Sequence, residues 1–492
     1  MGAYLSTRLL NIANTGLNAS KKSLEVTSHN ISNANTEGYS RQRVHQQSNM
    51  PLIKDGLITG SGTRIKSINR VHDKFVERKL RDSQSSESYY NNRAEQMSRV
   101  EDIFNEIDNE GLNQILNNFF NSFRDLANQP ENETVRSVVR DKAQLIVKDF
   151  RRIAETLDEI SKSIDDKIAI SVKDANQHID SIALLNRKIR ELEATGDETG
   201  DLRDQRDVSV KELSKIIKIH TYQDERGNYN VQSPGVGTLV TAAQAQKLGT
   251  YVFGKDESTN GQDGSMEIFW ESRSGQQITE KFQGGSLGAV IKVRNNDIKQ
   301  LKEKLDQTAY DFMNYVNAIH RRGYVNREIQ TDANGNPAAM DNKGPTTGNN
   351  FFSTPMKIEG AALNIDLSDA IKSDISNIAT ALSPNSPGDN RVAIAISKLQ
   401  HERLMAGGTA TLEEDYLKTV GSVGLETGKA KLDAEQSEGL LAQANSIRER
   451  ISGVSIDEEA ANMIKYQHAY EAAAKVMKTA NEMFDTVLSI KQ

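Results

Sequence analysis

The chain has 492 residues and no cysteine, which excludes disulfide bonds, thiol chemistry and cysteine-ligated metal sites. Its formal net charge of -7 comes without a basic block, which argues against a nucleic acid partner. Hydrophobic residues make up 36% of the chain and aromatic residues 5%, a mixture that favours elongated helical material over one large compact core.

An apolar repeat of seven residues runs through the first part of the chain. Its members are Leu10, Leu17, Leu24 and Ile31. The small residues Ala13, Ser20 and Thr27 lie between them. This 3-4 spacing predicts a helix whose apolar seam faces a partner helix. The alternative is an ordinary amphipathic helix on a local core.

A turn is predicted directly after this helix. The stretch NISNANTEGYSRQRV, residues 30–44, is rich in asparagine and contains Gly38. Both residue types tolerate left-handed backbone, and asparagine side chains bond exposed backbone groups. We therefore expect the helix to end here and the chain to continue as an extended segment.

Long helices are predicted further along, where proline is absent from residue 131 to 233. Apolar residues at helical spacing outline one helix between Phe150 and Leu192, about 60 Å long at 1.5 Å per residue. A second helix is expected to begin at LRDQRDVSVKELSKII, and a third to run from about Leu287 to His320. The charged residues of LRDQRDVSVKEL recur at helical spacing, which predicts solvated ion pairs.

The middle of the chain has the pattern of strands and turns. KIHTYQDERGNYNVQS predicts a hairpin, and TYVFG, SMEIFWES and QQITEKF predict strands. A β region is therefore expected inside an otherwise helical chain. The predicted fold is mainly α with an inserted β domain, an α+β arrangement of several domains.

The last helix carries the cleaner apolar seam. Its members at 3-4 spacing are Met463, Tyr466, Tyr470, Ala473, Met477, Ala480, Phe484 and Val487. Glu459 breaks the pattern near the start of the helix. Two seams at opposite ends of one chain predict that the terminal helices pack on each other as a coiled coil.

No recognisable constellation of residues predicts catalysis or metal binding. The eight histidines are dispersed, without an HExxH motif. TDANGNPAAMDNK resembles a calcium loop, but Pro337 stands where glycine is needed and Lys343 where glutamate is needed. We expect no enzymatic activity, no cofactor and no metal site.

Membrane insertion and a cleaved secretory signal are not predicted either. No apolar run approaches the roughly 20 residues that a membrane helix needs. The N-terminal stretch MGAYLSTRLLNIANTG contains no apolar core of the kind that a signal peptide has.

The order of residues in the predicted turn resembles the signature of the bacterial flagellar axial proteins, the family of rod, hook and hook-associated subunits. The matching residues are Asn30, Ile31, Asn33, Asn35, Thr36, Gly38, Tyr39 and Arg41. GSGTRIKSINRVHDKFVERKLR looks like the continuation of this signature, and the stretch from Ile451 to Ile490 is similar to the family's closing helix. Four other segments resemble the hook-associated junction subunits: DLRDQRDVSVKEL, GGSLGAVIKVRNNDI, PGDNRVAIAISKLQ and ISGVSIDEE.

The resemblance implies a structural subunit of the flagellum, an adaptor that joins hook to filament and polymerises through its terminal helices. It implies an extracellular location at the hook–filament junction, with export that needs no cleaved signal peptide. The implied partners are further copies of this chain, hook subunits, the next junction protein and an export chaperone. The chaperone would hold the C-terminal seam before neighbouring subunits do.

The resemblance also implies an elongated molecule of three domains. Residues 1–65 and 455–492 would form a terminal coiled-coil assembly domain. Residues 66–215, 286–322 and 390–454 would form a helical bundle. Residues 216–285 and 323–389 would form a β-rich domain that projects outward. Two alternatives stay open: another axial subunit, hook or flagellin-like, and a cytoplasmic coiled-coil scaffold.

Overall fold

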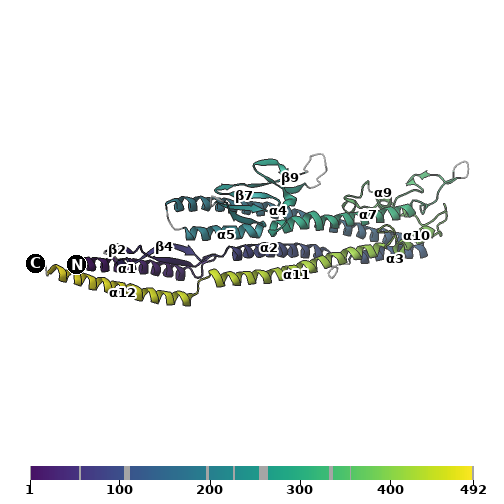
Figure 1. The fold of residues 1–492 in the computed structure, drawn as a ribbon. Helices are drawn as coiled ribbons and strands as arrows, with labels where there is room; N and C mark the ends of the chain where they lie inside the picture. The colour runs from purple at the N-terminus through teal and green to yellow at the C-terminus, as the bar shows by residue number, and fades with distance from the viewer. Residues whose placement is uncertain are drawn as a thin grey trace. The chain divides into compact units, whose positions relative to one another are not determined.

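The computed structural model describes residues 2–54, 57–104, 111–195, 199–224, 228–253, 264–331, 336–354 and 356–489. Helices dominate, and the strands form small antiparallel sheets (Figure 1). The predicted fold class, mainly α with an inserted β region, is confirmed.

The helices differ widely in length. In chain order they are α1 (Gly2–Ser32), α2 (Lys74–Ile103), α3 (Leu112–Asn128), α4 (Glu133–Thr195), α5 (Gly200–Ile216), α6 (Gly285–Lys292), α7 (Lys299–His320), α8 (Ala361–Asn364), α9 (Asp369–Ser373), α10 (Arg391–Lys398), α11 (Leu412–Ser452) and α12 (Ile456–Ser489). A π-helical turn, Val293–Ile298, joins α6 to α7. Short 3₁₀ turns occupy Thr279–Lys281, Ile375–Asn377 and Leu399–His401.

The strands are short and pair with near neighbours in the chain. They are β1 (Gln42–Ser48), β2 (Leu52–Lys54), β3 (Leu57–Thr59), β4 (Thr63–Arg70), β5 (His220–Gln223), β6 (Tyr229–Ser233), β7 (Gly237–Thr241), β8 (Gln244–Ala245), β9 (Leu248–Phe253), β10 (Ser265–Trp270), β11 (Arg273–Gln277), β12 (Met340–Asp341) and β13 (Gly344–Pro345). The sheets have the strand orders β1-β4, β2-β3, β5-β6-β7-β8, β11-β10-β9 and β12-β13.

The chain divides into two compact units. Unit 1 comprises Met1–Tyr89, Ser171–Gly288 and Glu435–Gln492, and unit 2 comprises Tyr90–Ile170 and Ala289–Ala434. Helices α2, α4 and α11 each continue from one unit into the other.

The central sheets of unit 1 are fixed to α4 by two asparagine side chains. Asn176 exchanges two hydrogen bonds with the backbone of Leu248, at 2.7 and 3.0 Å. Asn186 donates to the carbonyls of Tyr229 and Ala242. These bonds satisfy polar backbone groups at the sheet surface, so the sheets keep one position against the helix.

The core of unit 2 is a cluster of fully or almost fully buried phenylalanine rings. The cluster consists of Phe119, Phe120, Phe123, Phe150, Phe312, Phe351 and Phe352. Neighbouring rings lie mostly edge to face, as in the pair of Phe119 and Phe123, whose centroids are 5.1 Å apart. The cluster joins α3, α4, α7 and the segment before α8.

The grouping of residues 216–285 with residues 323–389 differs from the observed division. The first segment carries β5 to β11 and lies in unit 1. The second lies in unit 2, where its described residues contain two strands of two residues each and several short helices. Phe351 and Phe352 tie it to the aromatic cluster, a long-range packing that local sequence pattern does not reveal.

Two further local predictions need correction. QQITEKF is not one strand, because β11 ends at Gln277 and a 3₁₀ turn follows. The extended segment after α1 is present as β1, and it pairs antiparallel with β4, a pairing that the local sequence pattern does not predict.

Candidate functional site

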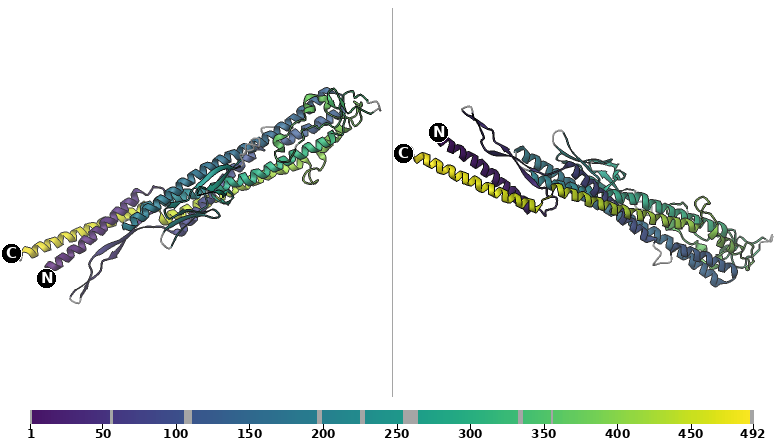
Figure 2. Two further views of the ribbon diagram at one scale, coloured as in Figure 1. Left: turned by 90° about the horizontal axis from the view of Figure 1, so that it is seen from above. Right: turned by 60° about the horizontal axis from the view of Figure 1, so that its bottom comes forward.

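The terminal helices α1 and α12 lie side by side in every view (Figures 1 and 2). Asn30 bonds Glu459, and a methyl group added at Gly16 would lie 3.8 Å from the Cβ of Ala473. Lower numbers on α1 therefore meet higher numbers on α12, so the pair is antiparallel. The predicted pairing of the terminal helices is confirmed.

The four apolar seam residues of α1 are half-buried: Leu10, Leu17, Leu24 and Ile31. The fully buried positions belong to smaller or polar side chains, namely Ala13, Ala19, Ser20, Ser23, Val26, Thr27 and Asn30. This inversion arises because α1 packs on β1 and β4 as well as on α12. Gln46 of β1, for example, donates to the Ser23 hydroxyl at 3.0 Å.

The seam of α12 is covered unevenly. Its half-buried members are Met463, Tyr466, Ala473, Met477 and Phe484. Ala480 is fully buried, whereas Tyr470 is 36% exposed. The side chain of Val487 lies outside the described part of the chain. Further large apolar residues of α12 are exposed: Ile456, Ile464, Val476 and Met483.

Asn30, the first residue of the family-like motif, is the polar hub of the helix pair. Its side chain is 1% exposed. The amide nitrogen donates to the carbonyl of Gln42 at 2.9 Å and to a carboxylate oxygen of Glu459 at 3.1 Å. The amide oxygen accepts from the Tyr39 hydroxyl at 2.8 Å and from the Gln42 backbone N–H at 2.9 Å. All four bonds that an asparagine amide can form are thus made, and they join α1, β1 and α12.

The contacts of Glu459 account for a carboxylate within an otherwise apolar seam. Its side chain is buried and accepts the bond from Asn30. A buried carboxylate requires such a donor, because an unpaired one loses its hydration without compensation. The break that Glu459 makes in the heptad therefore specifies which part of α1 can lie opposite it.

Tyr39 completes the hub. Its ring is buried, and its hydroxyl also lies 3.0 Å from Nδ1 of His29. Burial raises the pKa of the Tyr39 phenol, and the carboxylates of Asp201 and Asp204 raise it further. The hydroxyl therefore keeps its proton and remains a donor to Asn30.

The rest of the motif shapes the turn itself. Asn33 donates from its side chain to the carbonyl of His29 at 3.0 Å and accepts from the Thr36 hydroxyl at 3.2 Å. Gly38 has a φ of +80°, and a Cβ at this position would overlap the side chain of Val208. Glycine is required there for both its backbone conformation and its small size. Asn35 is exposed and is one of the residues that line the cleft beside the turn.

Helix α5 and strand β4 hold the chain that leaves the turn. The backbone N–H of Ser40 donates to Asp204 at 3.1 Å. Arg70 pairs with Asp204 and with Asp207, the latter at 3.0 Å. Burial alone would lower the pKa of Arg70, but these two carboxylates raise it, so the guanidinium stays protonated.

The expectation of solvated ion pairs in LRDQRDVSVKEL is wrong for its central residues. Asp204 and Arg206 are buried. The guanidinium of Arg206 lies 3.9 Å above the ring of Tyr229. The helical spacing of charges is the same for a solvated face as for this buried network, so sequence alone does not separate them.

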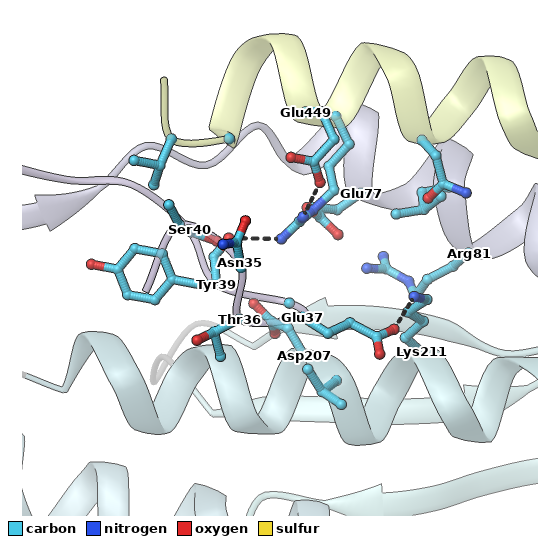
Figure 3. Close-up of a pocket in the computed structure, with 18 residues that line it drawn as sticks. Asn35, Thr36, Glu37, Tyr39, Ser40, Glu77, Arg81, Asp207, Lys211 and Glu449 are labelled. Atoms are coloured by element: carbon cyan, nitrogen blue, oxygen red, sulfur yellow. Dashed lines mark hydrogen bonds and ion pairs between the residues drawn. The ribbon is translucent and has the colours of Figure 1, made fainter. Parts of the chain in front are cut away.

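A cleft of about 290 Å³ lies beside the turn, between α2, α5 and the end of α11 (Figure 3). Arg448 donates to the carbonyl of Tyr39 at 3.1 Å and lies 3.5 Å from Glu77. Lys211 pairs with Glu37 at 2.9 Å, and this hydrogen bond lowers the pKa of Glu37. Lys211 of α5 and Arg448 of α11 therefore hold the turn directly, and Glu77 of α2 pairs with Arg448. None of these contacts is predicted from the sequence.

Among the residues that the structure describes, no group of three or more histidine, aspartate or glutamate side chains is arranged to hold a metal ion. None of the helices in the described ranges is both long and apolar enough to cross a membrane.

Comparisons with known proteins agree with this architecture. Residues 97–339 match the family model of the flagellar hook-associated protein FlgK helical domain. Residues 10–39 match the flagella basal body rod protein family, and residues 449–490 match the C-terminal family of the flagellar basal body rod FlgEFG proteins. The two terminal matches contain the motif turn and the α12 seam.

Flagellar hook-associated protein 1 of Bacillus subtilis is 30% identical over 516 residues, covering 98% of this chain and 97% of that protein. The protein of the same name from Salmonella typhimurium is 28% identical and covers 98% of this chain and 100% of that protein. The solved flagellar hook junction protein FlgK from Burkholderia pseudomallei matches with a TM-score of 0.61 and 16% identity. That match covers 76% of this chain and 100% of the other, and it supports the fold. The chain belongs to the flagellar hook-associated protein 1 family, a family of structural flagellar proteins.

Proposed function

We propose that this chain is a structural adaptor between hook and filament, and that it polymerises through α1 and α12. One observation carries the proposal. The α1–α12 pair buries small and polar side chains at its centre and leaves its large apolar side chains half-exposed.

The half-exposed seam supplies a driving force for assembly. Burial of apolar surface contributes roughly 25 cal/mol per Å², or about 1.5–3 kcal/mol for a large side chain that becomes fully buried. Leu10, Leu17, Met477 and Phe484 have part of that free energy still available when the chain is alone. Neighbouring copies that cover these side chains would release it.

The polar hub supplies the geometry for assembly. Asn30, Tyr39 and Glu459 fix the register at one end of the pair, where β1 also joins it. Toward the other end, the pair relies on close contacts between small residues such as Gly16 and Ala473. The distal part of both helices should become fully ordered when further copies dock, so that ordering and assembly are coupled.

The C-terminal seam would bind two partners in succession. An export chaperone would first take the amphipathic face of α12 in a groove, with Met463, Tyr470, Met477 and Phe484 as anchors at helical spacing. Neighbouring subunits, including hook subunits and the next junction protein, would later replace the chaperone. Such shielding would prevent premature polymerisation inside the cell, and export would proceed without a cleaved signal peptide.

Immunogold electron microscopy tests the location. Antibody against the β5–β11 region should label flagella in a narrow band where hook meets filament. Label along the whole hook or filament would assign the chain to another axial role. Label confined to the cell interior would favour a cytoplasmic scaffold.

Charge substitutions test the role of the seam. Met477→Glu and Phe484→Glu should each reduce chaperone binding and the amount of chain in purified flagella at least tenfold. Lys478→Glu introduces the same carboxylate at a neighbouring, highly exposed position and is the matched control. If both seam variants bound the chaperone and assembled like the control, the proposed seam would be wrong.

A further inference from the structure

His29 lies at the edge of the polar hub and joins it to α5. Its Nδ1 lies 3.0 Å from the Tyr39 hydroxyl, and its Nε2 lies 3.6 Å from a carboxylate oxygen of Asp201. The imidazole and phenol rings meet edge to face, with their centroids 5.6 Å apart. All three residues belong to unit 1. The two ring nitrogens of one histidine therefore face two different partners, one in the motif turn and one at the start of α5.

The backbone of Gln42 determines the directions of the hydrogen bonds in the hub. Its N–H can only donate and its carbonyl can only accept, so the side-chain amide of Asn30 has a single orientation. The amide oxygen of Asn30 therefore faces Tyr39, and the bond between them at 2.8 Å uses the one proton of the Tyr39 hydroxyl. A hydroxyl whose proton is already used can still accept a hydrogen bond. The bond between His29 and Tyr39 consequently requires a proton on Nδ1 of His29.

Neither neutral form of the His29 ring satisfies both of its partners. A neutral imidazole carries one proton, on either Nδ1 or Nε2. With the proton on Nδ1, the ring bonds Tyr39 but directs the lone pair of Nε2 toward the carboxylate of Asp201. With the proton on Nε2, the ring faces Asp201 correctly but opposes the lone pair of Nδ1 to the oxygen of Tyr39. Only the doubly protonated ring donates to the hydroxyl and attracts the carboxylate at the same time.

We propose that His29 is a positioning residue whose second proton couples the polar hub to α5. The contact between the motif turn and α5 is called the turn–α5 joint below. Histidine changes its charge between pH 5 and 8, a range in which aspartate and glutamate ordinarily stay ionised. As the pH falls through this range, the turn–α5 joint should become tighter. The joint lies within one copy of the chain, so it exists whether or not the chain acts as an adaptor in the flagellum.

The other charged groups around His29 respond to acid in the opposite direction. Asp204 of α5 accepts from the backbone of the turn, and Glu459 of α12 accepts from the hub amide. On α1 itself, Glu25 lies one helical turn before His29 and pairs with Lys22 at 3.4 Å. Protonation of any of these carboxylates weakens a contact of the hub or of α1. A joint that becomes tighter as the pH falls therefore reports His29 and not its acidic neighbours.

Amide hydrogen exchange at pH 8.0 and pH 5.5 tests this coupling in the purified full chain. The reporters are the backbone N–H groups of Ser40 and Gln42, which bond a carboxylate of α5 and the hub amide. After correction for the intrinsic effect of pH on exchange, their protection should rise about threefold at pH 5.5. The rise is modest because the side chains of His29 and Asp201 are 41% and 59% exposed, and exposed ion pairs contribute about 0.2–1 kcal/mol, or up to about fivefold. His29→Asn keeps an N–H donor near Tyr39 but cannot titrate, so its protection should stay nearly constant.

A second variant and a direct observation of the ring complete the test. Asp201→Asn keeps an acceptor for the Gln42 side chain, which donates to Asp201 at 2.9 Å, but removes the charge that attracts the second proton. The rise in protection should be smaller in this variant than in the unchanged chain. In nuclear magnetic resonance spectra with nitrogen-15-labelled histidine, the signals of His29 are those lost in His29→Asn, and they should show both ring nitrogens protonated at pH 5.5. An equal rise in protection in the unchanged chain and in His29→Asn, or a His29 ring that is still neutral at pH 5.5, would overturn the proposal.

Discussion

The interior of unit 2 and the α1–α12 pair of unit 1 bury different kinds of side chain. Unit 2 encloses seven phenylalanine rings within one copy of the chain. The terminal pair encloses alanine, serine, threonine, asparagine, glutamate and one valine, and leaves Leu10, Leu17, Leu24, Met463, Met477 and Phe484 half-exposed. The first region obtains its stability from its own apolar burial, whereas the second leaves much of its apolar surface exposed in one copy.

The two regions also specify their structure by different means. In unit 2 the shapes of interlocking rings select one arrangement. In the terminal pair a repeat of similar small residues would allow the helices to slide, and the bond between Asn30 and Glu459 selects one register. The terminal pair thus fixes its geometry with polar contacts and leaves its large apolar side chains partly uncovered in one copy.

Loss of one ring from the aromatic cluster should have the largest effect. Phe119 is fully buried and contacts five other rings, so Phe119→Ala should lower the free energy of unfolding of unit 2 by about 3–5 kcal/mol. Hydrogen exchange of α3 amides during urea titration measures it. The single tryptophan, Trp270, lies in unit 1, and its fluorescence should be unchanged. An equal shift of both signals would show that the two units unfold together.

A fall in pH should destabilise the same core. The ring of His320 is fully buried; Nδ1 lies 2.7 Å from the carbonyl of Asn349, and Nε2 accepts from the Ala379 N–H at 2.9 Å. Burial lowers the pKa of His320 to about 4, below its ordinary value of 6.5. The unfolded chain therefore binds a proton first as the pH falls. The contribution of neutral His320 to the free energy of unfolding is fully present above pH 6.5. It decreases by about 3 kcal/mol as the pH falls to about 4.

Hydrogen exchange of α7 amides at pH 7.0, 5.5 and 4.5 measures this loss. His320→Gln keeps a polar side chain but cannot titrate. The variant should be less stable at pH 7 and should lose less stability between pH 7 and pH 4.5. An identical pH dependence in both proteins would assign the effect to other groups.

Sequence pattern predicted the long helices well and the terminal seam incompletely. Apolar residues from Phe150 to Leu192 indicate α4, because one face of that helix is buried from Val139 to Ile189. The leucines of α1 revealed a helix but not which face is buried, because α1 has neighbours on two sides. Periodicity shows that a helix carries an apolar stripe. When a second element packs on the helix, other residues than the stripe become the most deeply buried ones.

The residues of the polar hub could be predicted from the sequence, but the hydrogen bonds between them could not. The family resemblance marks Asn30 and Tyr39, and Glu459 breaks the apolar seam of the last helix. Their mutual bonds were not predictable, because Asn30 and Glu459 are 429 residues apart. Local physical chemistry indicates that a buried carboxylate needs a donor, but not which donor the fold brings to it.

Replacement of the hub asparagine should have an intermediate effect. Asn30→Asp keeps the shape of the side chain but removes both N–H donors and places a second carboxyl group beside Glu459. We expect the free energy that protects the β1 amides from exchange to fall by about 1–3 kcal/mol at pH 7. Asn18→Asp makes the same change on the exposed face of α1 and is the matched control. Equal protection of the β1 amides from hydrogen exchange in the two variants would show that Asn30 does not fix the register of the helix pair.

The smallest effect on the isolated chain should come from the seam itself. Leu17 is only half-buried, and alanine has a better helix propensity, so Leu17→Ala should change the free energy of unfolding by less than about 1 kcal/mol. The same substitution should nevertheless reduce incorporation into flagella several-fold, because the assembled state would bury the whole leucine. Hydrogen exchange of α1 in the purified chain and quantification of the chain in purified flagella measure the two effects. A loss of several kcal/mol in the isolated chain would mean that the seam is already complete within one copy, and the contrast with the core of unit 2 would disappear.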